Sequence, residues 1–524
     1  MDSEYPPLPS SKAEVSLSDG EAGALASSGL ESPVLLTNGP SPNSTGQSNT
    51  QVIVDGGDII LEYVTSRHAA RGTSCWRVSS ESLVQSSPYF RVLLDPTKFS
   101  EGRHLMRQRE LYGGATGPSG FDPERDALPT VRLPDNHLPP RLGPDTIGFF
   151  LRVLSVNSFN EEEKESFAAE VRSQRPSFVA AVVELADAFN SPEVVRDTLK
   201  HSGYSLAKPK LPLTKFNTSM LKMNEDRIRQ SIFIAKFMGD RTIFQMLTHA
   251  LIVAGSKYWV NGVESPEPDT PSWHYFSDGL EDELYYRRQS VLNTITDLQA
   301  HFLRIYGAFE GPAPPKPGIP NASSSGFRPN QPQSQYQCRC GLGNSSACDA
   351  FHLGQMTRFF ALRTKTIFIG STLINPDFDP DIEDPASEAE FDAQSGLSPP
   401  PTDITSVISS LKQCPDYQID SNHIACGIRR RFLPSLDCID GFVGDERGLL
   451  GVNLINWRGD GSARKWPRIQ GSWANRSHRR ALVMDLRLSK ISGVPVMSPG
   501  GSGAQFREED ARLLFTAKKR NWES

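Results

Sequence analysis

The residues of this chain with the clearest chemical potential are cysteines and histidines in its C-terminal half. Six of the seven cysteines lie between residues 338 and 438. The segments 338–352 and 414–426 each combine cysteine with histidine at short spacing. Thiolate and imidazole groups are the usual ligands of tetrahedral zinc sites. The candidate zinc ligands are Cys338, Cys340, Cys348, His352, His423 and Cys426.

Two ligand sets are compatible with these spacings. Cys348 and His352 stand four residues apart at the start of a predicted helix, so both can point at one site. A local site joins them to the two cysteines of the C-R-C segment, and a composite site takes the H-x-x-C pair at 423–426 instead. C-x-C is tighter than the usual zinc spacing. The alternative is that the cysteines pack as small apolar side chains or have no role. If the cluster binds a cofactor, we expect structural zinc.

The sequence contains none of the common catalytic motifs that we sought. G-x-x-x-x-G-K-[ST], G-x-S-x-G and H-E-x-x-H are all missing. His423 lies near Asp420, a pairing that suits acid–base chemistry, but a capping or core role is the commoner use of such a pair. We therefore predict no catalytic residues and a protein that is not an enzyme.

Composition indicates folded blocks separated by long connectors. Of 524 residues, 37% are hydrophobic, and Pro (40) and Gly (41) are abundant. The net charge of −6 gives no general attraction to nucleic acid or membrane. No apolar run approaches the roughly 20 residues that span a bilayer. The first 20 residues lack the features of a secretory signal, so we expect a cytoplasmic or nuclear protein with reduced thiols.

The sequence predicts an α+β protein with mostly helical C-terminal domains, and the candidate ligands lie in those helical domains. In the second block, Ile228 and Ile232 recur at helical spacing, a break is expected at 239–240, and further helices are predicted over 242–253 and 280–309. The predicted organisation is a disordered tail at 1–50, a first folded block at 51–202 with a flexible insert at 102–129, a helical domain at 213–309, a Pro/Gly/Ser linker at 311–334, a mostly helical Cys/His domain at 335–457 with an acidic loop at 375–401, and a basic, largely disordered tail at 458–524.

The first block begins with strand-like and helix-like segments in a definite order. D-I-I-L-E-Y at 58–63 reads as one strand, and W-R-V at 76–78 as a second. A helix carrying Leu83 and S-P-Y-F follows, then a third strand within V-R-L-P-D at 131–135. Helices are expected over 147–154 and 182–189.

This order resembles a BTB (POZ) domain, a small sheet wrapped by helices that serves protein interaction and dimerisation. The resemblance departs from the family at Ser79, where a histidine is usual, and in lacking a Tyr-x-Gly after the third helix. It implies a homodimer. The residues matching the family's interaction motifs are Asp58, Leu83, Tyr89, Phe90, Phe99 and Glu101.

The C-terminal strings C-D-A-F-H-L-G-Q-M-T-R-F and C-P-D-Y-Q-I-D-S-N-H-I-A-C resemble fungal BTB proteins of an uncharacterised type. By analogy, the chain is expected to act as an adaptor that presents a client protein to a cullin-type ubiquitin ligase. The competing hypothesis is a nuclear or chromatin regulator whose Cys/His block and basic tail contact DNA. Nucleic-acid binding is the less favoured of the two, and no membrane association is expected.

Overall fold

The computed structural model shows a mixed α+β protein, mainly helical, with one small sheet. The predicted linker at 311–334 and acidic loop at 375–401 lie outside the residues it describes. So does the predicted tail at 1–50, apart from Thr50. The described residues are 50–65, 72–113, 128–133, 142–207, 213–259, 262–263, 266–267, 270–307, 337–338, 340, 344–366, 403–424, 426–455, 457, 466, 507–517, 520 and 522.

The N-terminal part forms a four-stranded sheet with strand order β1-β3-β2-β4. β2 and β3 are antiparallel, whereas β1 runs parallel to β3 and β4 parallel to β2. Three strands correspond to those predicted. β1 was not predicted. It pairs with β3, and its first residue, Thr50, was assigned to the disordered tail in the prediction. The strands are β1 (Thr50–Val52), β2 (Ile59–Thr65), β3 (Gly72–Val78) and β4 (Thr130–Arg132).

Helices pack around this sheet. Ser79 and Ser87 begin α1 and α2, where their side-chain oxygens accept hydrogen bonds from the backbone N–H groups of Ser82 and Phe90. The helices are α1 (Ser80–Ser86), α2 (Pro88–Leu93), α4 (Pro144–Leu154), α5 (Glu161–Ser173), α6 (Pro176–Ala188) and α7 (Pro192–His201), with a 3-10 turn η2 (Val156–Ser158).

One face of the sheet is in the core. Along β2, Ile59, Leu61 and Tyr63 are buried and alternate with partly exposed residues, as the two-residue period of a strand requires. Trp76 pairs with Leu61 and is also buried. A Cβ atom on Gly148 of α4 would lie 2.8 Å from the Trp76 indole nitrogen, so glycine is what lets α4 lie against the sheet.

The predicted flexible insert is partly helical. α3 (Ser100–Gly113) occupies its first part, and residues 114–127 lie outside the described structure. The helix is anchored because Leu105 is buried, Gln108 Oε1 accepts from the Thr130 backbone N–H at 2.9 Å, and Arg109 pairs with Asp58. The prediction was therefore wrong for 102–113.

The second block is helical, as predicted. Gly239 ends α8 with φ of 75°, and the Asp240 side chain accepts from the Ile243 N–H at 3.0 Å to begin α9, so the predicted break is confirmed. The elements are η3 (Met220–Lys222), α8 (Glu225–Met238), α9 (Arg241–Ala254), η4 (Lys257–Trp259) and α10 (Leu280–Ile305).

The third block is also helical. α11 continues directly into a π-helical turn, η5, and Pro434 lies inside α13. The elements are α11 (Ser345–Arg358), η5 (Phe359–Arg363), α12 (Ile404–Lys412), the 3-10 turn η6 (Ser421–His423) and α13 (Arg429–Val443).

The basic tail ends in an ordered helix, which the sequence prediction missed. α15 (Glu508–Thr516) buries Ala511, Leu514 and Phe515, and the Phe515 ring stacks on Trp466 with centroids 6.1 Å apart. Arginine is the commonest residue of the tail, which is why no helix was predicted there. The apolar face of α15 packs against Trp466 and α10, and this burial stabilises the short helix.

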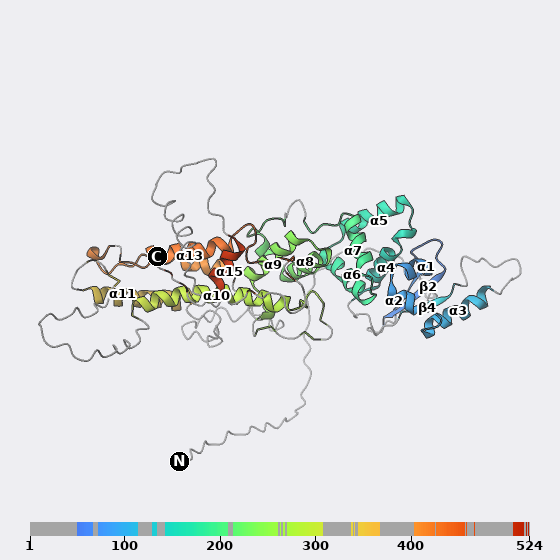
Figure 1. The fold of residues 1–524 in the computed structure, drawn as a ribbon, viewed down its shortest axis with the longest axis horizontal. Helices are drawn as coiled ribbons and strands as arrows, with labels where there is room; N and C mark the ends of the chain where they lie inside the picture. Colours follow the sequence, from blue (N-terminus) through green and yellow to red (C-terminus); the bar gives the residue numbers. More distant parts are fainter. Residues whose placement is uncertain are drawn as a thin grey trace, which may run out of the picture. The chain divides into compact units, whose positions relative to one another are not determined.

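Buried residues of the first, second and third blocks belong to one continuous hydrophobic core, although we predicted separate domains. α10 runs beside α13 and α15 (Figure 1). Arg287 of α10 donates to the carbonyl oxygens of Leu450 at 2.9 Å and Gly451 at 2.6 Å. None of the helices that the structure describes combines the length and the apolar character that a bilayer-spanning helix needs.

Candidate metal centre

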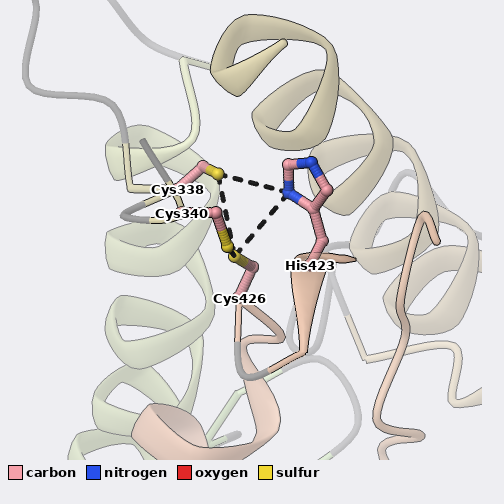
Figure 2. Close-up of side chains that lie close together, drawn as sticks. All are labelled: Cys338, Cys340, His423 and Cys426. Carbon is pink, nitrogen blue, oxygen red and sulfur yellow. Dashed lines mark hydrogen bonds between the residues drawn. The ribbon is translucent and has the colours of Figure 1, made fainter. Parts of the chain in front are cut away.

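Four of the candidate ligands come together from two segments far apart in the sequence. Cys338 and Cys340 lie just before α11, whereas His423 ends η6 and Cys426 lies just before α13. Their donor atoms all lie within 4.8 Å of one another. The three sulfurs and the His423 ring face a common centre (Figure 2). These residues can hold a metal ion.

Three of the four donor distances are close to those of a tetrahedral site, and the fourth, between the sulfurs of Cys340 and Cys426, is shorter. Cys338 Sγ lies 3.3 Å from His423 Nδ1 and 3.7 Å from Cys426 Sγ. Cys426 Sγ lies 3.1 Å from Cys340 Sγ and 3.9 Å from His423 Nδ1. Sulfurs that bind one tetrahedral zinc ion at 2.3 Å stand about 3.8 Å apart. The cysteines are not disulfide-bonded, so all three sulfurs can serve as ligands.

Hydrogen bonds to the backbone hold the first segment in place. The Asp349 carboxylate of α11 accepts from the backbone N–H groups of Gln337 at 2.8 Å and Cys338 at 3.0 Å. Arg431 of α13 donates to the Gln337 side-chain oxygen at 2.8 Å. These bonds fix the C-R-C segment against two helices, so Cys338 does not depend on a metal to find its position.

The second segment is held by its own turn. Asp420 Oδ1 accepts from the Asn422 N–H at 2.7 Å and thereby caps η6. The Cys426 N–H donates to the His423 carbonyl at 3.3 Å, and the Tyr306 hydroxyl donates to the Cys426 carbonyl at 3.2 Å. Asp420 therefore caps η6. The hydrogen bonds of the His423 ring are to Asn344, Cys338 and Cys426, and not to Asp420.

The tautomer of His423 is set from the far side of its ring. Its Nε2 lies 2.9 Å from Asn344 Oδ1, an acceptor, so Nε2 carries the proton. Nδ1 is then the unprotonated nitrogen and faces Cys338 and Cys426. A metal-binding histidine is typically oriented by such a bond through its other nitrogen. His423 is fully buried, which keeps the ring in this orientation.

The electrostatics of the cluster favour a cation. Burial raises the pKa of the Cys338 thiol, but hydrogen bonds from the Cys340 backbone and from Ser345, Cys426 and Cys348 outweigh it and lower that pKa to about 7. The hydrogen bond with Cys426, burial and neighbouring sulfur charge raise the pKa of Cys340 to about 12. Without a cation, one thiolate forms at the expense of its neighbours. A bound divalent ion removes this competition.

The structure thus favours the composite ligand set over the local one. Cys348 is fully buried, and burial, followed by the neighbouring thiols of Cys338 and Cys426, raises its pKa. His352, one turn later on α11, is fully buried and lies outside the four-donor group. The supporting residues Asn344 and Asp349 were not among the predicted ones, since an isolated Asn or Asp carries no ligand signal in a sequence.

Two of the predicted interaction residues have a different role in the structure. Leu83 and Phe90 are fully buried, so they pack in the core and cannot touch a partner. Tyr89 is partly buried against the rings of Phe90 and Phe189. Leu83 lies in α1 and Phe90 in α2, and both side chains point into the core.

The other three are accessible. Phe99 is 47% exposed and Glu101 partly exposed at the start of α3. Asp58 pairs with Arg109 and accepts hydrogen bonds from the Ser80 N–H and hydroxyl, each at 2.6 Å. Asp58 therefore joins β2 to α1 and α3 and is already engaged within the chain.

No family model, no curated protein and no solved structure matches this chain.

Proposed function

We propose that this protein is a non-enzymatic assembly protein whose helical body is held together by a structural zinc ion at Cys338, Cys340, His423 and Cys426. The observation that supports it is the convergence of three sulfurs and one imidazole nitrogen within 4.8 Å. Soft thiolate and imidazole donors suit zinc. Four protein ligands fill a tetrahedral sphere and leave no position for a reacting water, as structural zinc sites require.

The zinc role is tested by metal analysis of the intact, tag-free chain. The zinc that co-purifies with the chain should fall below the wild-type content in Cys340→Ala and in Cys426→Ala. The matched control is Cys438→Ser, which changes a cysteine of α13 outside the cluster. A wild-type chain with no zinc, or variants that keep all of it, would overturn the proposal.

The N-terminal block is the proposed interaction platform, of the BTB type. The observations in support are the central position of β2 between β3 and β4, and the helices packed on the buried face of the sheet. The partner surface would include Phe99 and Glu101, which are accessible at the start of α3. In this proposal the chain is a homodimer that links a cullin-type ligase to a client protein bound by the helical body.

The nuclear alternative has less support in the described part of the tail. Trp466 and Phe515 pack in the core, and Arg520 donates to the backbone oxygens of Leu514 and Phe515. These three residues make contacts within the chain and do not form a basic surface for nucleic acid.

The platform is tested with the full chain. Light scattering at micromolar concentration should give twice the monomer mass, and a monomer would overturn the homodimer. Phe99→Ala and Glu101→Lys should each abolish capture of a cullin scaffold. Leu362→Ala, which changes an even more exposed apolar residue, in η5, should leave capture intact. Capture that survives both substitutions would exclude this surface.

A further inference from the structure

A fully buried histidine beside the metal centre has no hydrogen-bond partner. Neither ring nitrogen of His352 contacts a donor or acceptor among the described residues, and its exposed fraction is 0%. Buried polar atoms are nearly always satisfied, and an orphaned one often marks a missing water or ion. A water needs several polar partners. An imidazole one helical turn from a thiol cluster has a simpler use, as a ligand.

A fourth cysteine lies one helical turn before this histidine. Cys348 precedes His352 by four residues on α11, which places both on one side of the helix. The Cys348 thiol is fully buried, and after burial the neighbouring thiols of Cys338 and Cys426 contribute to its raised pKa. Cys338 and Cys426 therefore have both His423 and Cys348 as neighbours.

The number of donors has a simple consequence. Two tetrahedral ions need eight metal–ligand bonds. Six ligands supply eight bonds when four bind one ion each and two thiolates bridge both ions. The chain offers six such side chains here, four cysteines and two histidines, and two of the cysteines, Cys338 and Cys426, have both His423 and Cys348 as neighbours.

We propose that the centre binds two zinc ions, bridged by Cys338 and Cys426. Cys340 and His423 complete the first ion, and Cys348 and His352 complete the second. This inference rests on the proposed structural zinc and extends it. It explains why a buried histidine has no hydrogen-bond partner among the described residues, and why a fourth thiol lies beside the three that one tetrahedral ion needs.

The first test is native mass spectrometry of the intact, tag-free chain purified with zinc. Two zinc ions per chain are expected. One ion per chain would overturn the binuclear centre while leaving the structural zinc in place. A metal-free chain would overturn both.

Variants separate the two ions. His352→Gln and Cys348→Ser should each lower the count from two to one, whereas Cys438→Ser should leave two. A count of two in His352→Gln and Cys348→Ser would overturn the assignment of these ligands.

Cobalt substitution of the wild type removes any dependence on how well the variants fold. Bridging thiolates couple the spins of two Co²⁺ ions, so the magnetic moment per cobalt should fall as the second equivalent binds. A moment per ion that stays constant through two equivalents would rule out the shared sulfurs.

Discussion

His423 and Asn344 are joined by a 2.9 Å hydrogen bond between the imidazole Nε2 and the side-chain amide oxygen. This bond connects the turn before α13 to the N-terminus of α11. It also leaves Nδ1 of His423 unprotonated and turned toward the sulfurs. The orientation of the only nitrogen ligand in the four-donor group therefore depends on a residue that never touches the metal.

Replacing Asn344 should weaken zinc binding without removing a ligand. Loss of a hydrogen bond that orients a metal-binding histidine typically costs about 10- to 100-fold in affinity. We expect Asn344→Ala to fall in that range in competition titrations against a chromophoric chelator. The control is Asn422→Ala, an exposed neighbour of His423. Equal affinities for the two variants would contradict the role given to Asn344.

Removing one ligand should destabilise the whole helical body. In the proposed centre, zinc would link Cys338 to His423, which are 85 positions apart, and so would close a long loop. A covalent link closing a loop of that length stabilises a fold by about 4 to 5 kcal/mol through chain entropy. We expect Cys426→Ala to lower the free energy of unfolding by about this amount in urea titrations.

A specific control follows from the same reasoning. Chelation of the wild type should bring its stability down to that of Cys426→Ala, and chelation of the variant should have little further effect. Additive losses from substitution and chelation would show that the two act at different places.

His249 predicts a loss of stability on mild acidification. Its Nε2 donates to the Val443 carbonyl at 3.0 Å, its Nδ1 accepts from the Leu450 N–H at 3.2 Å, and burial lowers its pKa to about 4. The unfolded chain binds this proton near pH 6.5, whereas the folded chain does not. The folded state is thus fully favoured above pH 6.5 and loses stability as the pH falls from 6.5 toward 4.

The size of this effect is about 1.4 kcal/mol per pH unit within that window, or about 2 kcal/mol between pH 7 and pH 5. His249→Gln cannot titrate and should lose less stability than the wild type over that interval. His201→Gln, at the exposed end of α7, serves as the control. Comparison at fixed zinc removes the contribution of the metal ligands, and identical pH profiles for wild type and His249→Gln would refute the assignment.

Removing the charge of Glu281, the partner of the buried Arg229 in α8, should lower the free energy of unfolding substantially. Arg229 is fully buried and binds Glu281 through two hydrogen bonds, at 2.7 and 3.0 Å, with a third to Glu225 at 2.8 Å. Removing one partner of a buried ion pair costs about 3 to 5 kcal/mol, and without the Glu281 charge only Glu225 would compensate Arg229. We expect Glu281→Gln to approach this value in urea unfolding.

An exposed ion pair gives the comparison. Glu161→Gln breaks the exposed pair with Lys164, and such pairs contribute about 0 to 1 kcal/mol. Similar losses for Glu281→Gln and Glu161→Gln would mean that the Arg229 network contributes no more than a surface contact.

Much of the local structure was predictable from the sequence because its signals are local. The period-two pattern of β2 and the Gly239–Asp240 break between α8 and α9 need no knowledge of distant residues. α3 and α15 were missed, because each is stabilised by a surface supplied from elsewhere in the chain. Arg109 reaches Asp58, and Phe515 packs on Trp466.

The metal centre was predictable in its residue types but not in its grouping. The spacing of Cys348 and His352 suggested a local site as strongly as a composite one. The choice depends on the return of the chain at His423 and Cys426, which only the packing of η6 and α13 against α11 determines. Tertiary packing decides which cysteines lie next to which histidine. The spacing along the sequence therefore allowed both the local and the composite ligand set.

Thermal unfolding of the full chain before and after exhaustive chelation tests the central claim most directly. With zinc as the clamp between the Cys338 and His423 segments, the metal-free chain should unfold at a clearly lower temperature. Zinc, but not magnesium, should restore the original transition. An unchanged unfolding temperature after complete removal of zinc would contradict the account.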